Sequence, residues 1–411
     1  MLLGAVAVMV VGVPALWVAI HEVSWLGPAL ADGTRAVLGP KAVAWAEDVA
    51  YDLQDRYDAW RYKDDKPKKF WDAPVPTAAP ALASGAPSAS GAPSAVPVAV
   101  TTGSAAPAAG AAEAASFPPP TFAPPIAAIA SEGDGIWIPI KDNGATPAGG
   151  GPPVMVKAVV HPDPKRGYAA VAVVAIDLKR IDLHMMAGTQ EPASDKVPAE
   201  HRPGIIPREA FGDLVAAFNG GFKAIHGHYG MMVEGETLVA PRDIGCTVAL
   251  FKDGSIKIRT WSAAKDAEFA MSGYRQTPPC LVEQGRVNDA LESVEYNKNW
   301  GATVSGDTVI RRSAIGLDKT GRVLFYGLGE AVTAQALARG MRAVGAEDAA
   351  QLDVNYSYPR FLFFDRFDGA AAGTPHVESA LIPGIKYQRT EYVGGSEVRD
   401  FFYLTRRRPA S

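Results

Sequence analysis

The stretch Phe218-Asn219-Gly220-Gly221-Phe222 decides how the rest of this chain is interpreted. The apolar residues 214–218 lead into it and predict a short buried strand. Asn219 and the two glycines then end that strand with residues that tolerate positive φ angles and allow a backbone to approach a ligand closely. We therefore expect the end of this strand to carry functional groups.

Two later segments repeat the pattern of an apolar strand beside polar residues. Residues 349–353 run into Asp353, and Arg312 opens the stretch Arg312-Ser313-Ala314-Ile315-Gly316. Because ligands of α/β sheets collect beyond strand ends, the three segments together predict one shared cleft.

The order and spacing of these segments over residues 214–364 resemble those of the phosphodiester glycosidase family. One difference concerns the loop after Asp353. The family continues its Leu-Asp as Asp-Gly-Gly-Gly-Ser, whereas this chain reads Asp353-Val354-Asn355-Tyr356-Ser357. The acid and the serine remain, but the glycines do not, so the loop has a different shape.

The resemblance implies hydrolysis of a sugar joined through its anomeric carbon to a phosphodiester. A phosphate monoester is a good leaving group, so one carboxylate and a cationic clamp can replace the usual pair of carboxylates. The family positions assign the catalytic carboxylate to Asp353 and the phosphate clamp to Arg312. The alternatives are an acid that caps a turn at Asp353 and a structural salt bridge at Arg312.

Five further residues in the two turns are predicted to bind substrate. The side chain of Asn219 and the amides of Gly220 and Gly221 are placed to donate to phosphate or to sugar hydroxyls, and the alternative is a turn without a ligand. Asn355 and Ser357 are predicted to carry substrate hydrogen bonds from the altered loop.

Two histidines follow the glycine turn. We expect His226 to line the cleft and to bind substrate, and His228 to act as a catalytic proton donor; the alternative for His228 is a surface hydrogen bond. Without a third ligand of clear spacing, two histidines do not predict zinc, so we expect no metal and no cofactor.

Residues 132–411 are predicted to form one domain of mixed α/β (α+β) class, with a mixed β-sheet core and few helices. A helix capped by Thr333 is expected to run through Val344 to Gly345 and to form a β-α-β element with the strand before Asp353. We expect residues 263–309 to be less regular and to lie over the cleft. Strands are predicted at 136–140, 154–160, 169–178, 181–185, 214–218, 229–239 as a hairpin, 246–251, 255–261, 313–317, 323–327, 349–353, 361–364 and 401–405.

The two cysteines, Cys246 and Cys280, are compatible with one disulfide and equally with two unpaired thiols. An exported domain would favour pairing, because disulfides persist in oxidising compartments.

Three segments precede the domain. Residues 1–31 contain an uncharged run at 2–20, long enough to cross a bilayer, and form a membrane anchor or an export signal; we favour the uncleaved anchor. Residues 32–73 contain an amphipathic helix at 41–62, and residues 74–131 form an Ala/Pro/Ser-rich disordered linker. The apolar stripe of the helix consists of Trp45, Val49, Leu53, Tyr57 and Trp60.

This order predicts a membrane-anchored protein whose folded domain lies in a periplasm or outside the cell. The expected partners are a sugar-phosphate or glycan substrate and the membrane, through residues 2–20. The helix at 41–62 is expected to bind a partner helix or the membrane surface. The alternative is that it forms a hairpin with the anchor helix or pairs with a second copy of itself. A net charge of -4 gives no indication of a nucleic-acid partner. The alternative function is a catalytically inactive glycan-binding or envelope-scaffold domain on the same fold.

Overall fold

The computed structural model describes residues 40–62, 69–72, 116–142, 145, 151–293, 297–301, 308–365 and 373–408. The predicted membrane segment at 2–20 and residues 74–115 of the predicted linker lie outside these ranges. Among the described residues, no helix has the length and apolar character needed to cross a membrane.

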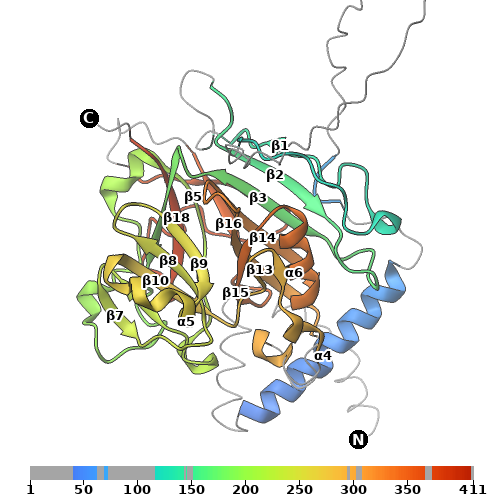
Figure 1. Cartoon of the computed structure of the whole chain (residues 1–411), viewed down its shortest axis with the longest axis horizontal. Coiled ribbons are helices and arrows are strands. Elements are labelled where there is room, and N and C mark those ends of the chain that lie inside the picture. The colour runs from blue at the N-terminus through green and yellow to red at the C-terminus, as the bar shows by residue number, and fades with distance from the viewer. Residues whose placement is uncertain are drawn as a thin grey trace, which may run out of the picture.

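Three sheets, in which all strand pairs are antiparallel, make up the domain (Figure 1). The largest has eight strands in the order β1-β2-β3-β14-β13-β15-β11-β12. Its strands are β1 (Ile138–Pro139), β2 (Met155–Val160), β3 (Val171–Asp177), β11 (Val282–Glu283), β12 (Arg286–Val287), β13 (Ile310–Leu317), β14 (Val323–Val332) and β15 (Asp348–Val354).

The two smaller sheets have five strands each. The order β17-β16-β5-β18-β4 joins β4 (Ile181–Met186), β5 (Leu214–Asn219), β16 (Phe361–Phe364), β17 (Val377–Ala380) and β18 (Phe401–Arg406). The order β7-β6-β10-β8-β9 joins β6 (Met231–Val233), β7 (Glu236–Val239), β8 (Cys246–Phe251), β9 (Ile256–Thr260) and β10 (Met271–Thr277). The described α-helices are α4 (Pro40–Arg61), α5 (Trp261–Ala264) and α6 (Ala334–Ala343). The predicted sheet-rich core with few helices is confirmed.

The predicted β-α-β element is formed by β14, α6 and β15. Both strands pair antiparallel with β13, which lies between them, so they run parallel to each other. Thr333 caps the helix, since its Oγ1 accepts a hydrogen bond from the amide of Ala336 at 3.1 Å. Gly345, at φ +100°, follows the helix in the conformation that glycine adopts readily.

Four strands were not predicted: β10, β11, β12 and β17. β10 lies in the middle of its sheet, between β6 and β8, where a less regular cover was expected. Its sequence does not resemble a buried strand because Arg275, Gln276 and Thr277 are polar, yet all three are buried. They are tolerated there because each has hydrogen-bond partners: Arg275 donates to Asp400, Gln276 bonds Arg242 and Thr247, and Thr277 donates to the carbonyl of Pro278.

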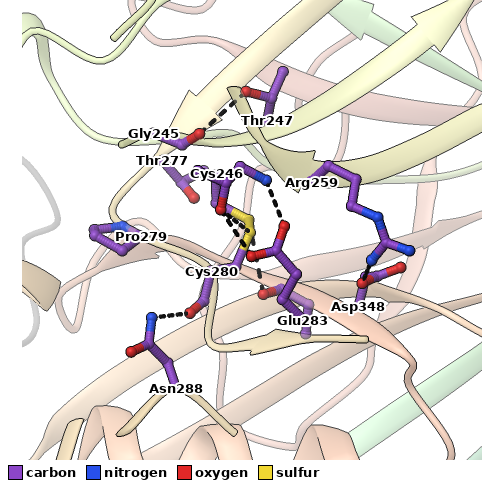
Figure 2. Close-up of a disulfide and its surroundings, with 12 residues drawn as sticks. Gly245, Cys246, Thr247, Arg259, Thr277, Pro279, Cys280, Glu283, Asn288 and Asp348 are labelled. Atoms are coloured by element: carbon purple, nitrogen blue, oxygen red, sulfur yellow. Dashed lines mark hydrogen bonds and ion pairs between the residues drawn. A yellow bond between two sulfur atoms is a disulfide. The ribbon is translucent and has the colours of Figure 1, made fainter. Parts of the chain in front are cut away.

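Cys246 and Cys280 form a disulfide, so the paired alternative holds (Figure 2). Cys246 begins β8, and Cys280 lies in the connection that leads from β10 to β11 in the eight-stranded sheet. Asn288 fixes this connection by donating to the carbonyl of Cys280 at 2.9 Å, as Figure 2 shows. The bond therefore ties β8 to the chain that crosses between two sheets.

The strand before the glycine turn lies where two sheets meet. The ring of Phe218 in β5 stacks on Phe361 of β16 and Phe402 of β18, with centroids 5.4 and 5.3 Å apart. It also contacts Tyr326 of β14 in the eight-stranded sheet at 4.9 Å. This aromatic packing fixes the position of the next residue, Asn219.

Candidate functional site

Asn219 ends β5 as a fully buried hydrogen-bonding centre. Its Nδ2 donates to Ser313 Oγ at 2.9 Å, and its Oδ1 accepts from the hydroxyl of Tyr326 at 2.8 Å and from the amide of Arg360 at 3.2 Å. The side chain thus links the segment at 312–316 to the residue that directly precedes the two glycines. Its hydrogen bonds go to protein groups.

The amides of Gly220 and Gly221 point at the residue that precedes β18. Gly220 N donates to the carbonyl of Asp400 at 3.0 Å, and Gly221 N donates to its Oδ2 at 2.9 Å. A Cβ on Gly220 would lie 2.1 Å from Asp400 Oδ2, and one on Gly221 would lie 2.8 Å from Arg275 Cζ. Both glycines are therefore required by close packing of protein groups.

Asp400 and Arg275 form a buried ion pair under this turn. Arg275 Nε donates to Asp400 Oδ2 at 2.8 Å and its Nη2 donates to Oδ1 at 3.2 Å, with both side chains almost fully buried. The guanidinium also donates to the carbonyls of Tyr229 and Phe222 at 3.2 and 2.5 Å. This pair fixes the glycine turn against β10 and β18, and it was not predicted from the sequence.

Asp353 ends β15 beside the same turn. Its amide donates to the carbonyl of Gly220 at 3.1 Å, and its carboxylate is ion-paired with Arg399. The side chain is only 4% exposed. Burial raises the pKa of Asp353, although the charge of Arg399 opposes the rise.

Arg399 is the cation of the site. Its guanidinium carbon lies 3.9 Å from the ring centre of Tyr358, and its Nη2 donates to the carbonyl of Gly221 at 3.2 Å. Its Nε is buried and has no hydrogen-bond partner among the described residues. Although burial opposes the charge, the carboxylate of Asp353 raises the pKa of Arg399, so the guanidinium stays charged. The sequence signal for this residue is the pair Arg399-Asp400 directly before the predicted strand at 401–405.

Arg312 lies apart from this group. Its guanidinium donates to the carbonyls of Val332, Trp300 and Thr308 at 3.1, 2.5 and 2.9 Å, and to Gln351 Oε1 at 3.2 Å. Burial lowers the pKa of Arg312 to about 10. Its guanidinium is thus bonded to carbonyl oxygens away from Asp353 and Arg399, and its predicted role as phosphate clamp stays a prediction.

The altered loop after Asp353 is organised by Asn355. Its Oδ1 accepts from the amides of Ser357 and Tyr358 at 2.9 and 2.6 Å and from the hydroxyl of Ser357 at 3.2 Å. Its Nδ2 reaches Asp353 Oδ2 at 3.4 Å. Asn355 therefore belongs to the site through Asp353, whereas the hydroxyl of Ser357 donates to Asn355 within the loop and its carbonyl accepts from Arg360 Nη2 at 2.5 Å.

His226 and His228 are exposed in the loop after the glycine turn, and His228 has φ +50°. Their predicted roles stay predictions. In the part of the chain that the structure describes, no cluster of three or more His, Cys, Asp or Glu side chains is arranged to bind a metal.

Comparison with known families bears on the resemblance. Residues 212–353 match the family model of the phosphodiester glycosidases, which confirms the predicted resemblance. The matched stretch includes Asn219, both glycines, Arg312 and Asp353, and it ends before Arg399 and Asp400.

Two solved structures show low similarity. A hypothetical protein from Synechocystis has 11% identity and a TM-score of 0.35, with 62% of each chain covered. A Burkholderia pseudomallei protein provisionally described as exported has 10% identity and a TM-score of 0.25, with 58% of this chain and 74% of that chain covered. The chain thus spans less than two thirds of the Synechocystis protein. Comparison with curated proteins finds no match.

Proposed function

We propose that the domain is a phosphodiester glycosidase that hydrolyses the bond between C1 of a sugar and a phosphodiester oxygen. The observation that carries the proposal is the guanidinium of Arg399 beside the buried carboxylate of Asp353. Its Nε has no hydrogen-bond partner among the described residues, so it retains a donor for an anionic ligand. This pair supplies the one acid and one cation that such a reaction requires.

In the proposed reaction Arg399 donates a charge-assisted hydrogen bond to a phosphate oxygen of the substrate. The C1–O bond breaks and the phosphate monoester leaves with the bonding electrons, while water adds its oxygen to C1. Asp353 accepts the proton that the water loses. The burial that raises the pKa of Asp353 also makes it a stronger base.

The test is sugar release from a panel of sugar-1-phosphodiesters by the full chain. We expect Asp353→Asn to lower kcat/KM by roughly 10²-fold or more, as for loss of a general base. Arg399→Lys keeps the positive charge but loses the planar set of hydrogen-bond donors. We therefore expect it to lower kcat/KM for the charged diester. Asp213→Asn, which changes an ion pair at the surface, is the control. Full turnover by Asp353→Asn would rule the reaction out.

We also propose that residues 2–20 anchor the protein and that the substrate belongs to an exported or envelope glycan. The disulfide between Cys246 and Cys280 supports an oxidising compartment. The uncharged run at 2–20 supports the anchor. Cell fractionation, with protease added to intact cells, tests both: a protein recovered in the soluble fraction, or a domain protected inside the cytoplasm, would contradict the proposal.

A catalytically inactive glycan-binding or scaffold domain is the second candidate. It is favoured by the enclosure of the site, because Asp353 is ion-paired and nearly buried and the loop at 354–358 is hydrogen-bonded within itself. Under this alternative the full chain binds glycan, detected by calorimetry, but releases no sugar from any diester.

A further inference from the structure

The N-terminal helix α4 contacts the domain through its acidic side. Arg166 Nε and Nη2 donate to Asp55 Oδ1 and Oδ2 at 2.8 and 2.7 Å, which is the paired geometry of a strong charge-assisted contact. The hydroxyl of Tyr168 donates to Asp55 Oδ1 at 2.7 Å. One carboxylate of the helix therefore receives three hydrogen bonds from the turns that precede β3.

Aromatic contacts extend this interface along the helix. Tyr62, directly after α4, contacts the ring of Tyr168 with centroids 5.6 Å apart. At the other side of Asp55, Tyr51 contacts the ring of Tyr356 at 6.2 Å. The second half of the helix, drawn in blue in Figure 1, and the residue that follows it thus contact the domain at three positions, 51, 55 and 62.

Four residues of the apolar stripe, Val49, Leu53, Tyr57 and Trp60, are exposed at 40, 61, 50 and 72%, whereas Asp55 is largely covered. Over residues 49–62 the described contacts of the helix with its domain are therefore polar and aromatic. Because most helical stability in proteins comes from tertiary packing, docking also stabilises the helix itself.

The contact with Tyr356 connects α4 to the candidate site. Tyr356 follows Asn355, whose side chain reaches Asp353 and fixes the loop through its Oδ1. Tyr356 is also contacted by Arg311, whose guanidinium carbon lies 5.8 Å from the ring centre and whose Nη1 donates to the Tyr356 carbonyl. The ring of Tyr356 thus contacts both Arg311 and Tyr51.

We propose that α4 is an intramolecular brace: by docking through Asp55 it presses Tyr51 against Tyr356 and keeps the loop at 354–358 in the conformation that positions Asp353. The brace regulates the site whose reaction is proposed above, and its effect on turnover rests on that proposed function. Phe70, which follows the helix in the chain, is buried in the main core cluster, so the helix stays tethered to the domain when it undocks. Rebinding is therefore an intramolecular step.

Hydrogen exchange of the full chain without substrate tests the brace. In Asp55→Asn we expect the amides of 40–62 and of 354–358 to exchange roughly tenfold faster, the change expected from loss of one charge-assisted contact. Tyr168→Phe removes one hydrogen bond to Asp55 and should act in the same direction but less. Asp52→Asn is the matched control, since Asp52 is exposed and pairs with Arg56 on the same helix.

Two results would overturn the proposal. One is unchanged exchange at 40–62 in Asp55→Asn, which would show that this carboxylate does not dock the helix. The other is faster exchange at 40–62 with no change at 354–358, which would show that the helix does not support the loop. Exchange in β5 reports whether the variants are folded. Because no substrate is used, a failure of sugar hydrolysis in the wild type leaves this test intact.

Discussion

The buried pair of Asp400 and Arg275 gives the sharpest test of how the site is built. Asp400→Asn keeps the shape of the side chain and removes its charge, so Arg275 is left buried without an anion. Its guanidinium forms two hydrogen bonds to the carboxylate, at 2.8 and 3.2 Å, and both side chains are excluded from water. Breaking such a pair from one side costs about 3–5 kcal/mol.

The cost can be measured by urea unfolding and by thermal melts. At roughly 2–4 °C per kcal/mol for a domain of this size, we expect the melting temperature to fall by roughly 6–20 °C. Asp213→Asn is the control, because Asp213 pairs with Arg408 at 2.6 Å but the arginine side chain is 73% exposed. That exposed pair should contribute about 1 kcal/mol or less. If both variants lost the same small free energy of unfolding, the inference that this pair fixes the glycine turn would be refuted.

The disulfide, the glycine turn and two carboxylates give further expectations. Replacing Cys246 and Cys280 by serine opens a loop with a sequence separation of 34 and should lower the free energy of unfolding by about 4 kcal/mol, measured in urea. Gly220→Ala places a Cβ 2.1 Å from a carboxylate oxygen and should cost more than about 2 kcal/mol in the same assay. Because burial raises the pKa of Asp353, kcat/KM should fall as pH is lowered through that raised value, and a profile flat across the acid range would contradict its role as base. Burial opposes the charge of Asp55, but the hydrogen bonds that it accepts from the domain lower its pKa below the ordinary value of 3.8. Docking of α4 should therefore be complete above pH 3.8 and should weaken as the pH falls through the lowered pKa of the folded state, which hydrogen exchange at 40–62 measures.

Apolar periodicity predicted most of the sheet strands, because their burial follows directly from apolar side chains. β3 is buried at every position, as its uninterrupted apolar run indicated, and β5 ends at Asn219 as the turn residues required. β10 was missed because its burial depends on a partner far along the chain: Arg275 is excluded from water only because Asp400 lies opposite. No local pattern contains that information.

The loop after Asp353 shows a similar limit. Among the described residues, none from 354 to 358 has a positive φ angle, so the loop does not use the conformations that glycines would permit. Asn355 replaces that freedom with hydrogen bonds from its side chain, and this fixes the loop in one shape. The loss of glycine was visible in the sequence, whereas the compensating role of Asn355 required the structure.

The choice between Arg312 and Arg399 as the cation depends on which side of a strand faces the site. Neighbouring residues of a strand point to opposite faces, and Ser313 is the one that reaches Asn219, so Arg312 points away. The pairing of β13 also shifts register on both sides of Arg312, which interrupts the alternation that a sequence pattern assumes. Arg399 lies beyond the residues that match the family model, yet the end of β5 pairs with the start of β18 and brings it to Asp353. The cation of the site is therefore determined by sheet topology, and substitution of Arg399 should impair diester hydrolysis directly, whereas substitution of Arg312 should act through stability.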